Sequence, residues 1–582
     1  MDLTRLSVIT VVHCVACAAG AGASQPVAVA VAGQQAPGLA MGLTFTTATG
    51  SQDLSAPRVN SLGQLAFAFE VVGSGVTSAN DGVLFRGVPG ALFPVFREAE
   101  ASPGSGSAIL SFRDVVLNDA GILALTLNIS GGNVIAGHDG SNALPMLWTG
   151  RPLPDVAGVN FSSTTASPNL SSTGTAVFKG SVSGAVSGTG LFAANDMNNV
   201  TTVFLPGEQA PGLDPGVQFS VSDGFSNASP TINDHGVMAF TRPLQGTGVN
   251  SSNDESAWVG APGAIQLLAR EGDPAPDLTG INYGPLAYTN NITVDNSGTC
   301  VFTAELTGSG VNFSNDRAVF YGTPGNMHLL VREGQPMPEG FPAGSAIIGI
   351  QGAVRNGNGI CALHLVASIN AGIGIHTGNN DALYIGTPGN LRLVFREGVQ
   401  APGMAAGVAA GVPQSWYLNS RGEVFAWALL SGPGITSGNS QLAYVSGPNG
   451  NAFPVLQSGG TIEVAPGDIR TIQSVRFLGD NDGRPVSNGQ DGRATCFSDQ
   501  GRLAFQAFLV GGGGAQAYID VQYPEACGAD IDGSNQVDFA DLNVLLEQWG
   551  TSGPEGDVDG SGAVDFADLN ILLNGWGQPC TP

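Results

Sequence analysis

Positive charge is the scarcest property of this sequence. The 582 residues include a single lysine, Lys179, and 20 lysine and arginine residues in total against 46 acidic ones, so the formal net charge is −26. A surface of this sign repels nucleic acid and anionic lipid and attracts divalent cations. We therefore expect no nucleic-acid partner, and we look for metal ligands among the acids.

Long apolar runs are also missing. Beyond residue 23 no stretch approaches the roughly 20 apolar residues of a membrane-spanning helix, so no membrane span is expected. At the N-terminus, Arg5 precedes a short apolar run to Ala19 and the small-residue motif Ala21-Gly22-Ala23. This pattern predicts a signal peptide over residues 1–23, cleaved near Ala23, and a secreted, cell-surface or periplasmic location.

Charged residues make up only 11% of the chain, against a usual share of about 25%, while 42% of the residues are hydrophobic. This composition excludes a disordered acidic chain. Glycine, at 86 residues, is about twice as frequent as usual, which indicates many tight turns between strands. The length allows one to four domains.

Cysteine is rare, with seven residues, and two of these lie in the signal peptide. Cys300, Cys361 and Cys496 lie in apolar strand segments, where we expect small buried residues. Cys527 and Cys580 bracket the C-terminal segment, and we expect them to form a disulfide in an oxidising compartment.

Catalytic motifs are absent too. None of the six histidines forms an H-x-H or H-E-x-x-H pair, and no G-x-S-x-G elbow or P-loop occurs. Glycosidases place two carboxylates about 5–10 Å apart, and the sequence does not say which of its loop acids could form such a pair. These loop acids include Asp114, Asp223, Asp254, Glu305, Asp480 and Asp482.

A repeated turn is what the sequence has in abundance. The pattern N-x-x-G, with Ser or Asp replacing Asn in three copies, precedes an apolar strand eight times, and its glycines are Gly63, Gly121, Gly174, Gly236, Gly298, Gly359, Gly422 and Gly501. The first residue is expected to bond its own backbone, and the glycine to adopt a left-handed conformation. Alternation such as LAFAF predicts the strand that follows.

Two further marks recur in most units. One is an Arg-Glu pair, at Arg97-Glu98, Arg270-Glu271, Arg332-Glu333 and Arg396-Glu397; the other is a loop ending in Asn-Asp, at Asn80-Asp81, Asn253-Asp254, Asn315-Asp316 and Asn380-Asp381. A pair repeated in several units favours packing, between blades or onto the next turn, over a ligand site. The Asn-Asp loops favour turn chemistry over calcium ligation.

Residues 24–523 therefore read as about eight units of about 62 residues, each with four short strands. We predict a mainly β domain, an eight-bladed β-propeller, with seven blades, two smaller propellers or an open β-solenoid as alternatives. The body begins with a closing strand, in Val27 to Gly38, and its last unit stops before one. The first strand is expected to complete the last blade and leave no open edge.

The body resembles a bacterial tandem-repeat family known for its NxxGxxxAF motif, whose members carry one of several C-terminal anchors. The resemblance implies an exported repeat protein and no established activity.

The C-terminal domain, residues 524–582, contains one twelve-residue pattern twice, as DIDGSNQVDFAD and DVDGSGAVDFAD. Oxygen ligands recur at loop positions 1, 3, 5, 7, 9 and 12, the spacing that wraps a short loop around Ca²⁺. The predicted ligands of two ions are Asp530, Asp532, Ser534, Gln536, Asp538 and Asp541, and Asp557, Asp559, Ser561, Ala563, Asp565 and Asp568, with Gln536 and Ala563 using backbone carbonyls. Val537 and Val564, at position 8, are expected to pack between the loops.

A helix is expected after each loop, because leucines recur at i, i+3 and i+4 from Leu542 and from Leu569. Each helix is followed by Trp-Gly, and the glycine suits a C-cap. The duplicated loop and helix, with Asp at position 12, resemble the type I dockerin, which implies a small all-α module of paired EF-hands and a cohesin partner on a scaffold. Phe539-Ala540 and Phe566-Ala567 stand where cellulosomal dockerins carry a Ser/Thr-type recognition pair.

We therefore expect an exported, non-catalytic repeat protein that uses a calcium-dependent module for docking to a cohesin-like or cell-surface scaffold protein. The alternative is a dockerin-borne component that binds polysaccharide or degrades it as a glycoside hydrolase or lyase, with its site on the propeller face. A third possibility is that calcium only stabilises the C-terminal domain.

Overall fold

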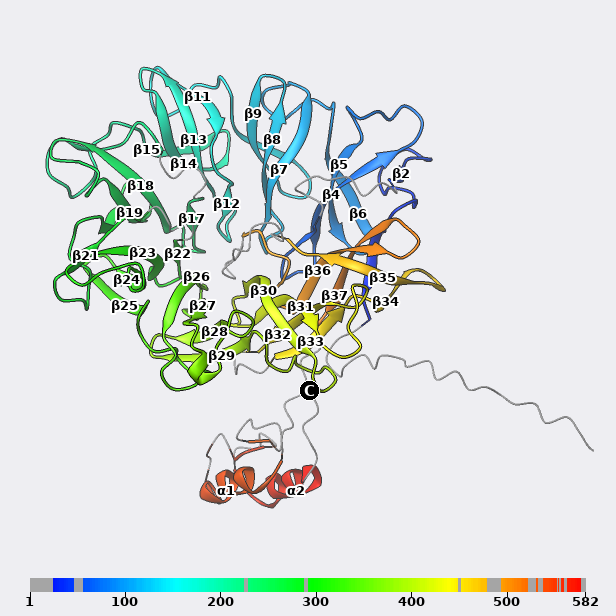
Figure 1. Ribbon diagram of the computed structural model, residues 1–582. Coiled ribbons are helices and arrows are strands. Elements are labelled where there is room, and N and C mark those ends of the chain that lie inside the picture. Colours follow the sequence, from blue (N-terminus) through cyan, green and yellow to red (C-terminus); the bar gives the residue numbers. More distant parts are fainter. Residues whose placement is uncertain are drawn as a thin grey trace, which may run out of the picture. The chain divides into compact units, whose positions relative to one another are not determined.

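The computed structural model divides the chain into two compact units, residues 24–523 and a second unit that contains residues 524–582 (Figure 1). We describe each by itself. The structure describes residues 25–46, 56–223, 229–286, 292–447, 452–478 and 493–521 of the body, and 530–531, 537–551, 553, 556–558 and 563–576 of the C-terminal unit. The predicted signal peptide and the predicted Cys527–Cys580 disulfide lie outside these residues.

The body is a β-propeller of four-stranded blades, and its described strands form eight sheets that follow one another around a common centre (Figure 1). We number the blades in chain order. Blade 1 contains β2 (Thr44–Phe45), β3 (Arg58–Val59), β4 (Leu65–Val72), β5 (Gly82–Val88) and β6 (Ala91–Arg97), and blade 2 contains β7 (Ile109–Leu117), β8 (Leu123–Ile129), β9 (Gly132–His138) and β10 (Ala143–Trp148). Blade 3 contains β11 (Val159–Thr164), β12 (Asn169–Leu170), β13 (Ala176–Gly184), β14 (Gly188–Asp196) and β15 (Asn199–Phe204). Blade 4 contains β16 (Val217–Phe219), β17 (Thr231–Ile232), β18 (Met238–Gly246), β19 (Glu255–Gly260) and β20 (Gln266–Arg270).

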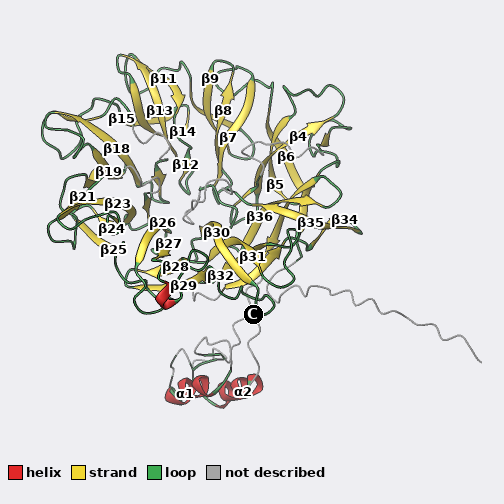
Figure 2. Cartoon of the chain, in the orientation of Figure 1, coloured by secondary structure: helices red, strands yellow, loops and turns green. Residues whose placement is uncertain are grey.

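Blade 5 contains β21 (Ile281–Tyr283), β22 (Thr293–Val294), β23 (Cys300–Gly308), β24 (Arg317–Thr323) and β25 (Asn326–Arg332), and blade 6 contains β26 (Ile347–Arg355), β27 (Cys361–Ala367), β28 (Asp381–Thr387) and β29 (Asn390–Arg396). Blade 7 contains β30 (Ala409–Leu418), β31 (Val424–Ser431), β32 (Gln441–Ser446) and β33 (Ala452–Gln457). Blade 8 contains β34 (Thr461–Ala465), β35 (Asp468–Arg476), β36 (Arg502–Leu509) and β37 (Gly514–Asp520) with β1 (Val27–Val31). Figure 2 shows the strands in yellow.

The sheets of blades 1, 3, 4 and 5 contain five strands because their first strand is divided into two short pieces. In blade 1, β2 pairs with the end of β4 (Phe45 opposite Val71) and β3 with its beginning (Val59 opposite Leu65). In blade 2 the corresponding strand is continuous, and register shifts in β7 absorb the irregularity. Blades 1 to 7 are therefore four strands wide, as the sequence predicted, and blade 8 contains β34 to β37 together with β1.

The apolar face of each sheet packs against the next blade. One buried cluster joins Ala66 and Leu84 of blade 1 to Leu125 and Leu127 of blade 2, and another joins Phe204 of blade 3 to blade 4. Burying a large apolar side chain stabilises a fold by about 1.5–3 kcal/mol, so the stability of the body comes from surfaces shared between neighbouring blades.

Strand β1 belongs to the last sheet. It pairs antiparallel with β37, with Val27 opposite Tyr518 and Ala28 opposite Ala517, and parallel with β34. The prediction that the first strand completes the last blade is confirmed. This pairing removes the open edges that an unclosed sheet would present.

The C-terminal unit contains the helices α1 (Phe539–Glu547) and α2 (Phe566–Gly575), drawn in red in Figure 2. The leucine spacing predicted both. The glycine prediction was wrong by two residues for α1, because its C-cap is Gln548, while Gly550 adopts a left-handed φ of 74° and donates to Val564 O. The described part of the body also contains a short 3₁₀ helix, Ala371–Ile373.

Candidate functional site

The two calcium-loop patterns end in identical geometry. Asp538 is the N-cap of α1: its Oδ1 accepts from Ala540 N (2.7 Å), and Asp541 Oδ2 accepts from Asp538 N (2.8 Å). Asp565 and Asp568 repeat these contacts at α2 with the same distances, 2.7 and 2.8 Å. Each pair is a reciprocal capping box, which holds positions 9 and 12 of the loop together.

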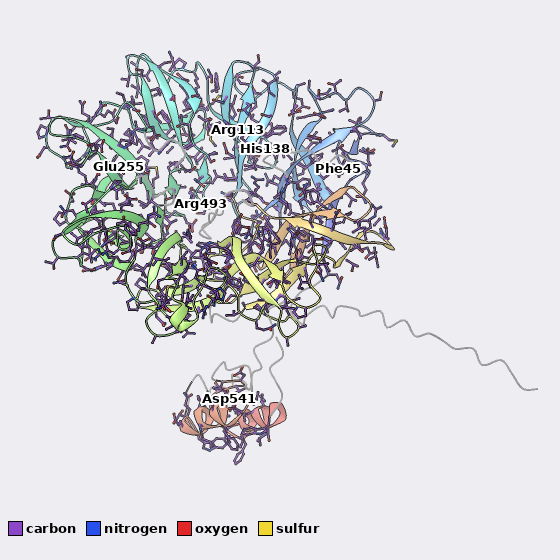
Figure 3. The ribbon with its side chains drawn as sticks, viewed as in Figure 1. Phe45, Arg113, His138, Glu255, Arg493 and Asp541 are labelled. Atoms are coloured by element: carbon purple, nitrogen blue, oxygen red, sulfur yellow. The ribbon has the colours of Figure 1, made fainter. Side chains whose placement is uncertain are left out.

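Asp541 and Asp568 are fully buried, at 0% exposure; Figure 3 labels Asp541. Burying a carboxylate is expensive unless hydrogen bonds or a cation compensate its charge. In a calcium loop, position 12 is where a carboxylate turns inward to the ion. The burial of both residues is therefore the arrangement that such a loop requires.

Seven of the twelve predicted ligand residues lie in the described part of the chain: Asp530, Asp538, Asp541, Asp557, Ala563, Asp565 and Asp568. The other five, Asp532, Ser534, Gln536, Asp559 and Ser561, lie outside it. Among the residues that the structure describes, no group of three or more His, Cys, Asp or Glu side chains is arranged to hold a metal ion. The described geometry thus brings together positions 9 and 12 of each loop.

The two repeats pack into one unit around the valines at position 8. Val537 and Val564 are buried with Leu545 and Leu572, as predicted for residues between paired loops. The backbones also join, because Val564 N donates to Thr551 O (2.9 Å). These contacts fix the second loop against the end of α1.

Two aromatic contacts that the sequence did not predict cross between the repeats. Phe539 meets Trp576 edge to face at 5.0 Å between ring centroids, and Trp549 meets Phe566 at 5.1 Å. The phenylalanine of each loop thus packs on the tryptophan that follows the other helix. Even so, Phe539 and Phe566 are 72% and 71% exposed. The sequence contained one indication of these contacts, because the two phenylalanines and the two tryptophans are each 27 residues apart.

In the body, the repeated Asn does what its position predicted and also bonds the next blade. Its Oδ1 accepts from its own turn, as in Asn233 with Val237 N (2.9 Å). Its Nδ2 donates to the backbone of the next unit: Asn60 to Asn118 O (2.9 Å), Asn118 to Ser171 O (2.9 Å), Asn233 to Asp295 O (2.7 Å), Asn356 to Asn419 O (2.9 Å) and Asn419 to Ser498 O (3.2 Å).

Other groups bridge the three junctions where Ser or Asp replaces Asn. They are Ser172 Oγ to Asp234 O (3.2 Å) between blades 3 and 4, Arg355 Nε to Asp295 Oδ2 (2.8 Å) between blades 5 and 6, and Arg502 Nη1 to Gly63 O (3.3 Å) between blades 8 and 1. A polar contact therefore crosses every junction from blade 1 round to blade 8 and back. The repeat motif is the part of each unit that joins it to the next.

In four blades the arginine of the Arg-Glu pair bonds a loop of its own blade, whereas the sequence predicted that the pairs hold adjacent blades or the following turn together. The arginine Nε donates to the carbonyl of the loop asparagine in four blades: Arg97 to Asn80 (2.9 Å), Arg270 to Asn253 (2.8 Å), Arg332 to Asn315 (2.9 Å) and Arg396 to Asn379 (3.1 Å). Because the same contact recurs in each blade, its role is to fix the loop.

The Asn-Asp loops are turns, as predicted. Asn80 Oδ1 accepts from Thr77 N (2.7 Å) and its Nδ2 donates to Gly75 O (3.2 Å). In blade 6 the corresponding residue is Asn379, which bonds His376 N and Gly374 O, and the choice of Asn380 was wrong by one residue. An extra asparagine in that loop shifts the motif.

Comparison with known proteins places the body. The family model DUF7453, a family of unknown function, matches residues 15–291 and again residues 281–515. The chain belongs to this family. No curated protein matches the chain.

Several solved structures are similar to this DUF7453 chain at low sequence identity. They include the β-propeller domain of the Trilobed protease from Pyrococcus furiosus (7% identity, TM-score 0.35, covering 70% of this chain and 98% of that one), an oligogalacturonate lyase in complex with manganese (12%, 0.34, 81% and 99%) and the tricorn protease (11%, 0.32, 69% and 36%). This chain spans about a third of the tricorn protease chain.

Two further sets of ionisable side chains in this DUF7453 chain lie within the body. The single lysine lies between blades 3 and 4, where Asp223 contacts both Lys179 Nζ (3.5 Å) and Arg242 Nη1 (3.4 Å). Burial lowers the pKa of Lys179 to about 8, with the Arg242 charge adding to the effect and Asp223 opposing it. His364 Nε2 lies 3.0 Å from Asp381 Oδ1, with His364 buried and Asp381 half-buried.

The structure also tests the predictions for the cysteines of the body and for its loop acids. Cys300, Cys361 and Cys496 are buried, as expected. Of the loop acids weighed for catalysis, Glu305 contacts Arg317 (3.8 Å) and Asp114 accepts from Ser167 Oγ (2.8 Å), while Asp480 and Asp482 lie outside the described residues.

Among the described helices, none is long and apolar enough to span a membrane.

Proposed function

We propose that this chain is an exported, non-catalytic repeat protein whose C-terminal unit binds two calcium ions and docks it to a scaffold or surface protein. The observation that carries the proposal is the duplicated capping box with a fully buried aspartate at position 12 of each loop. The export step rests on the sequence pattern of residues 1–23.

The residues present fit calcium. It is a hard cation that takes six to eight oxygen ligands, and each loop carries acid, hydroxyl or carbonyl oxygens at the six required positions. In the first loop Asp530, Asp532, Ser534, Gln536, Asp538 and Asp541 would hold the ion, and in the second Asp557, Asp559, Ser561, Ala563, Asp565 and Asp568. Bound calcium would compensate the buried charge of Asp541 and Asp568.

The docking surface that we propose is the exposed apolar side of the two helices. Phe539 and Leu546 of the first repeat are matched, 27 residues later, by Phe566 and Leu573, and all four are exposed. Exposed large apolar groups clustered in a small unit favour a protein interface. A cohesin-like partner follows from the resemblance of the duplicated loops to the type I dockerin.

We further propose that the body is a closed ring of eight blades that serves as a binding or display surface. The pairing of β1 with β37 and the polar bridge between blades 8 and 1 support closure. The repeated Arg-Glu and Asn-Asp elements fix loops, which supports a non-catalytic body. A polysaccharide ligand of the body stays a prediction, which a glycan array tests directly.

The test of docking is a calcium-dependent pull-down. Immobilised full-length protein is incubated with the secreted proteins of its own organism, with calcium or with EDTA. We expect a partner that is retained only with calcium and is lost when Asp530→Ala is combined with Asp557→Ala. Asp468→Ala, an exposed acid of the body, is the control and keeps the partner. Retention by the double variant would place docking elsewhere.

A further inference from the structure

Three blades place two carboxyl groups side by side where their third strand begins. The glutamate of the Arg-Glu pair (Glu98, Glu271 or Glu333) lies against the aspartate of the Asn-Asp loop (Asp81, Asp254 or Asp316) in blades 1, 4 and 5. Glu271 and Glu333 are 6% and 4% exposed, whereas the aspartates are half-buried. Two carboxylates in contact repel each other unless a positive charge lies between them.

The backbone holds the glutamate in this position. Glu98 Oε2 accepts from Gly82 N (2.9 Å), and Glu333 Oε2 accepts from Arg317 N (3.2 Å). A Cβ atom at Gly82 would lie 2.5 Å from Glu98 Cδ, so the carboxyl group is wedged against the strand. In blade 4, Glu271 Oε2 is buried and has no hydrogen-bond partner.

The groups that face these glutamates are mostly acidic. Besides the aspartates, they are Glu70 in blade 1, Glu255 in blade 4 (Figure 3) and Arg317 in blade 5, where Arg317 also contacts Glu305. The arginine beside each glutamate turns its Nε to the loop carbonyl instead. Burial first, and the neighbouring acids second, raise the pKa of Glu271 and Glu333 to about 7, and raise that of Glu98.

Blade 7 shows what the same position needs. There Ser458 replaces the glutamate and Ser440 replaces the aspartate, and Ser458 Oγ accepts from Gln441 N (3.0 Å) just as the glutamate oxygen does in other blades. Both acids are replaced together, and by neutral groups. A neutral acceptor therefore makes the same bond to the backbone at this position.

A proton would supply the missing positive charge with fewer oxygen ligands than a metal ion needs. Calcium takes six to eight oxygens, and the described residues contain no group of three acidic or other metal-ligating side chains arranged around an ion. A proton needs two oxygens, which the pair supplies. We propose that Glu98, Glu271 and Glu333 each share one proton with Asp81, Asp254 and Asp316, respectively, and that the body releases these protons, loosening the three loops, as the solution turns alkaline.

The direction of the effect follows from linkage. Between about pH 4.5, where an unfolded glutamate ionises, and about pH 7, the native state keeps the proton that the unfolded state has lost. Stability therefore falls as pH rises across this window, and the contribution is gone above pH 7. Each such group raises the unfolding equilibrium constant by up to about tenfold per pH unit.

The test compares full-length protein with the Glu271→Gln/Glu333→Gln variant in EDTA. Glutamine keeps the acceptor for the backbone and supplies a permanent donor to the aspartate. We expect equal stability at pH 5, a variant more stable than the wild type at pH 8 by tenfold or more in the unfolding constant, and a shallower pH profile. Glu208→Gln is the matched control, because exposed Glu208 also accepts from a backbone group, Leu205 N (2.9 Å), and its profile follows the wild type.

Two readouts distinguish a shared proton from a bound metal ion and from a purely structural carboxylate. Difference infrared spectroscopy at pH 6 is expected to show a carboxylic-acid C=O band in the wild type that is weaker in the double variant, where only the Glu98–Asp81 pair remains. A variant less stable than the wild type at both pH values, or no such band, would overturn the proposal. Calcium that stabilises the body at pH 8 in the wild type and not in the variant would overturn it in favour of metal ligation.

Discussion

The asparagine of the repeated turn has two partners, and this explains why the turn recurs with so little variation along the chain. Asn118, Asn233, Asn356 and Asn419 are all fully buried. A buried amide that loses its partners costs free energy, so each position needs both an acceptor for its own turn and a donor to the next blade. Serine satisfies the first need but does not reach the second.

We expect Asn233→Ala to destabilise the body by about 1–3 kcal/mol, because it leaves Val237 N without its partner and removes the inter-blade bond to Asp295 O, which then accepts from Gly298 N alone. Denaturant unfolding measures the change. Asn199→Ala is the control, because that side chain is exposed and bonds an exposed carboxylate; surface changes of this kind alter stability by less than about 0.5 kcal/mol. Equal effects from the two changes would contradict the inter-blade role.

The buried lysine gives a second prediction at this scale. The pKa of Lys179 is lowered from 10.5 to about 8, so the folded state disfavours its charge. Below pH 8 the full penalty, up to about 3 kcal/mol, is present, and stability rises between pH 8 and 10.5 as the native state loses its proton first.

Lys179→Met should therefore raise the melting temperature at pH 7 and abolish the rise above pH 8, leaving Asp223 paired with Arg242. Thermal melts across this pH range measure both effects. Arg392→Met, on an exposed side chain, serves as the control and should change neither. A loss of stability at pH 7 would show that Lys179 is needed as a cation.

At the scale of elements, the C-terminal unit is held by contacts that cross between its repeats. Edge-to-face aromatic pairs contribute about 0.5–1.5 kcal/mol beyond the area they bury. Phe539→Ala with Phe566→Ala removes both pairs and should weaken calcium binding to the full-length protein, because the loops are then less well ordered. Calorimetric titration measures this. Leu546→Ala, exposed on the same helix, should leave affinity unchanged; equal weakening would contradict the role of the pairs.

Much of each element could be predicted from sequence. The alternation around Phe67 predicted β4, and the leucine spacing predicted α1 and α2. Partners far along the chain could not be predicted, because Asn118 Nδ2 reaches a carbonyl 53 residues away and Phe539 a tryptophan in the other repeat. Insertions also limited the prediction of equivalent residues between blades, because one extra residue beside Asn379 shifts the loop motif.

For the proposed calcium site, spacing alone predicts the ligand positions, and the structure adds that Asp541 and Asp568 are buried. The sequence could not show this, because the burial depends on the packing of Val537 and Val564 against both helices. It could also not show that the Arg-Glu pairs act within a blade. That depends on which loop carbonyl the arginine meets.

At the scale of the whole molecule, the proposed closure of the body depends on β1. Ala28 lies opposite Ala517 in antiparallel strands, where paired Cα atoms are about 4.5–5.5 Å apart and suit a disulfide. Ala28→Cys with Ala517→Cys should therefore cross-link on oxidation and raise the melting temperature.

The control for that cross-link pairs Ala28→Cys with Asn326→Cys, an exposed position on β25 of blade 5. Mass spectrometry under non-reducing conditions distinguishes the two variants. Failure of the Ala28–Ala517 pair to cross-link, or equal cross-linking of the control, would contradict a ring sealed by its first strand.

The central claim is that the duplicated C-terminal loops bind calcium, and its most direct measurement is the calcium stoichiometry of the full-length protein. Isothermal titration of calcium-free protein is expected to give two ions per chain, and none for Asp541→Ala combined with Asp568→Ala. At a hundredfold excess over Kd, each site would add about 2.7 kcal/mol to the stability of the C-terminal unit. A wild-type protein that binds no calcium, or a double variant that still binds two ions, would contradict the account.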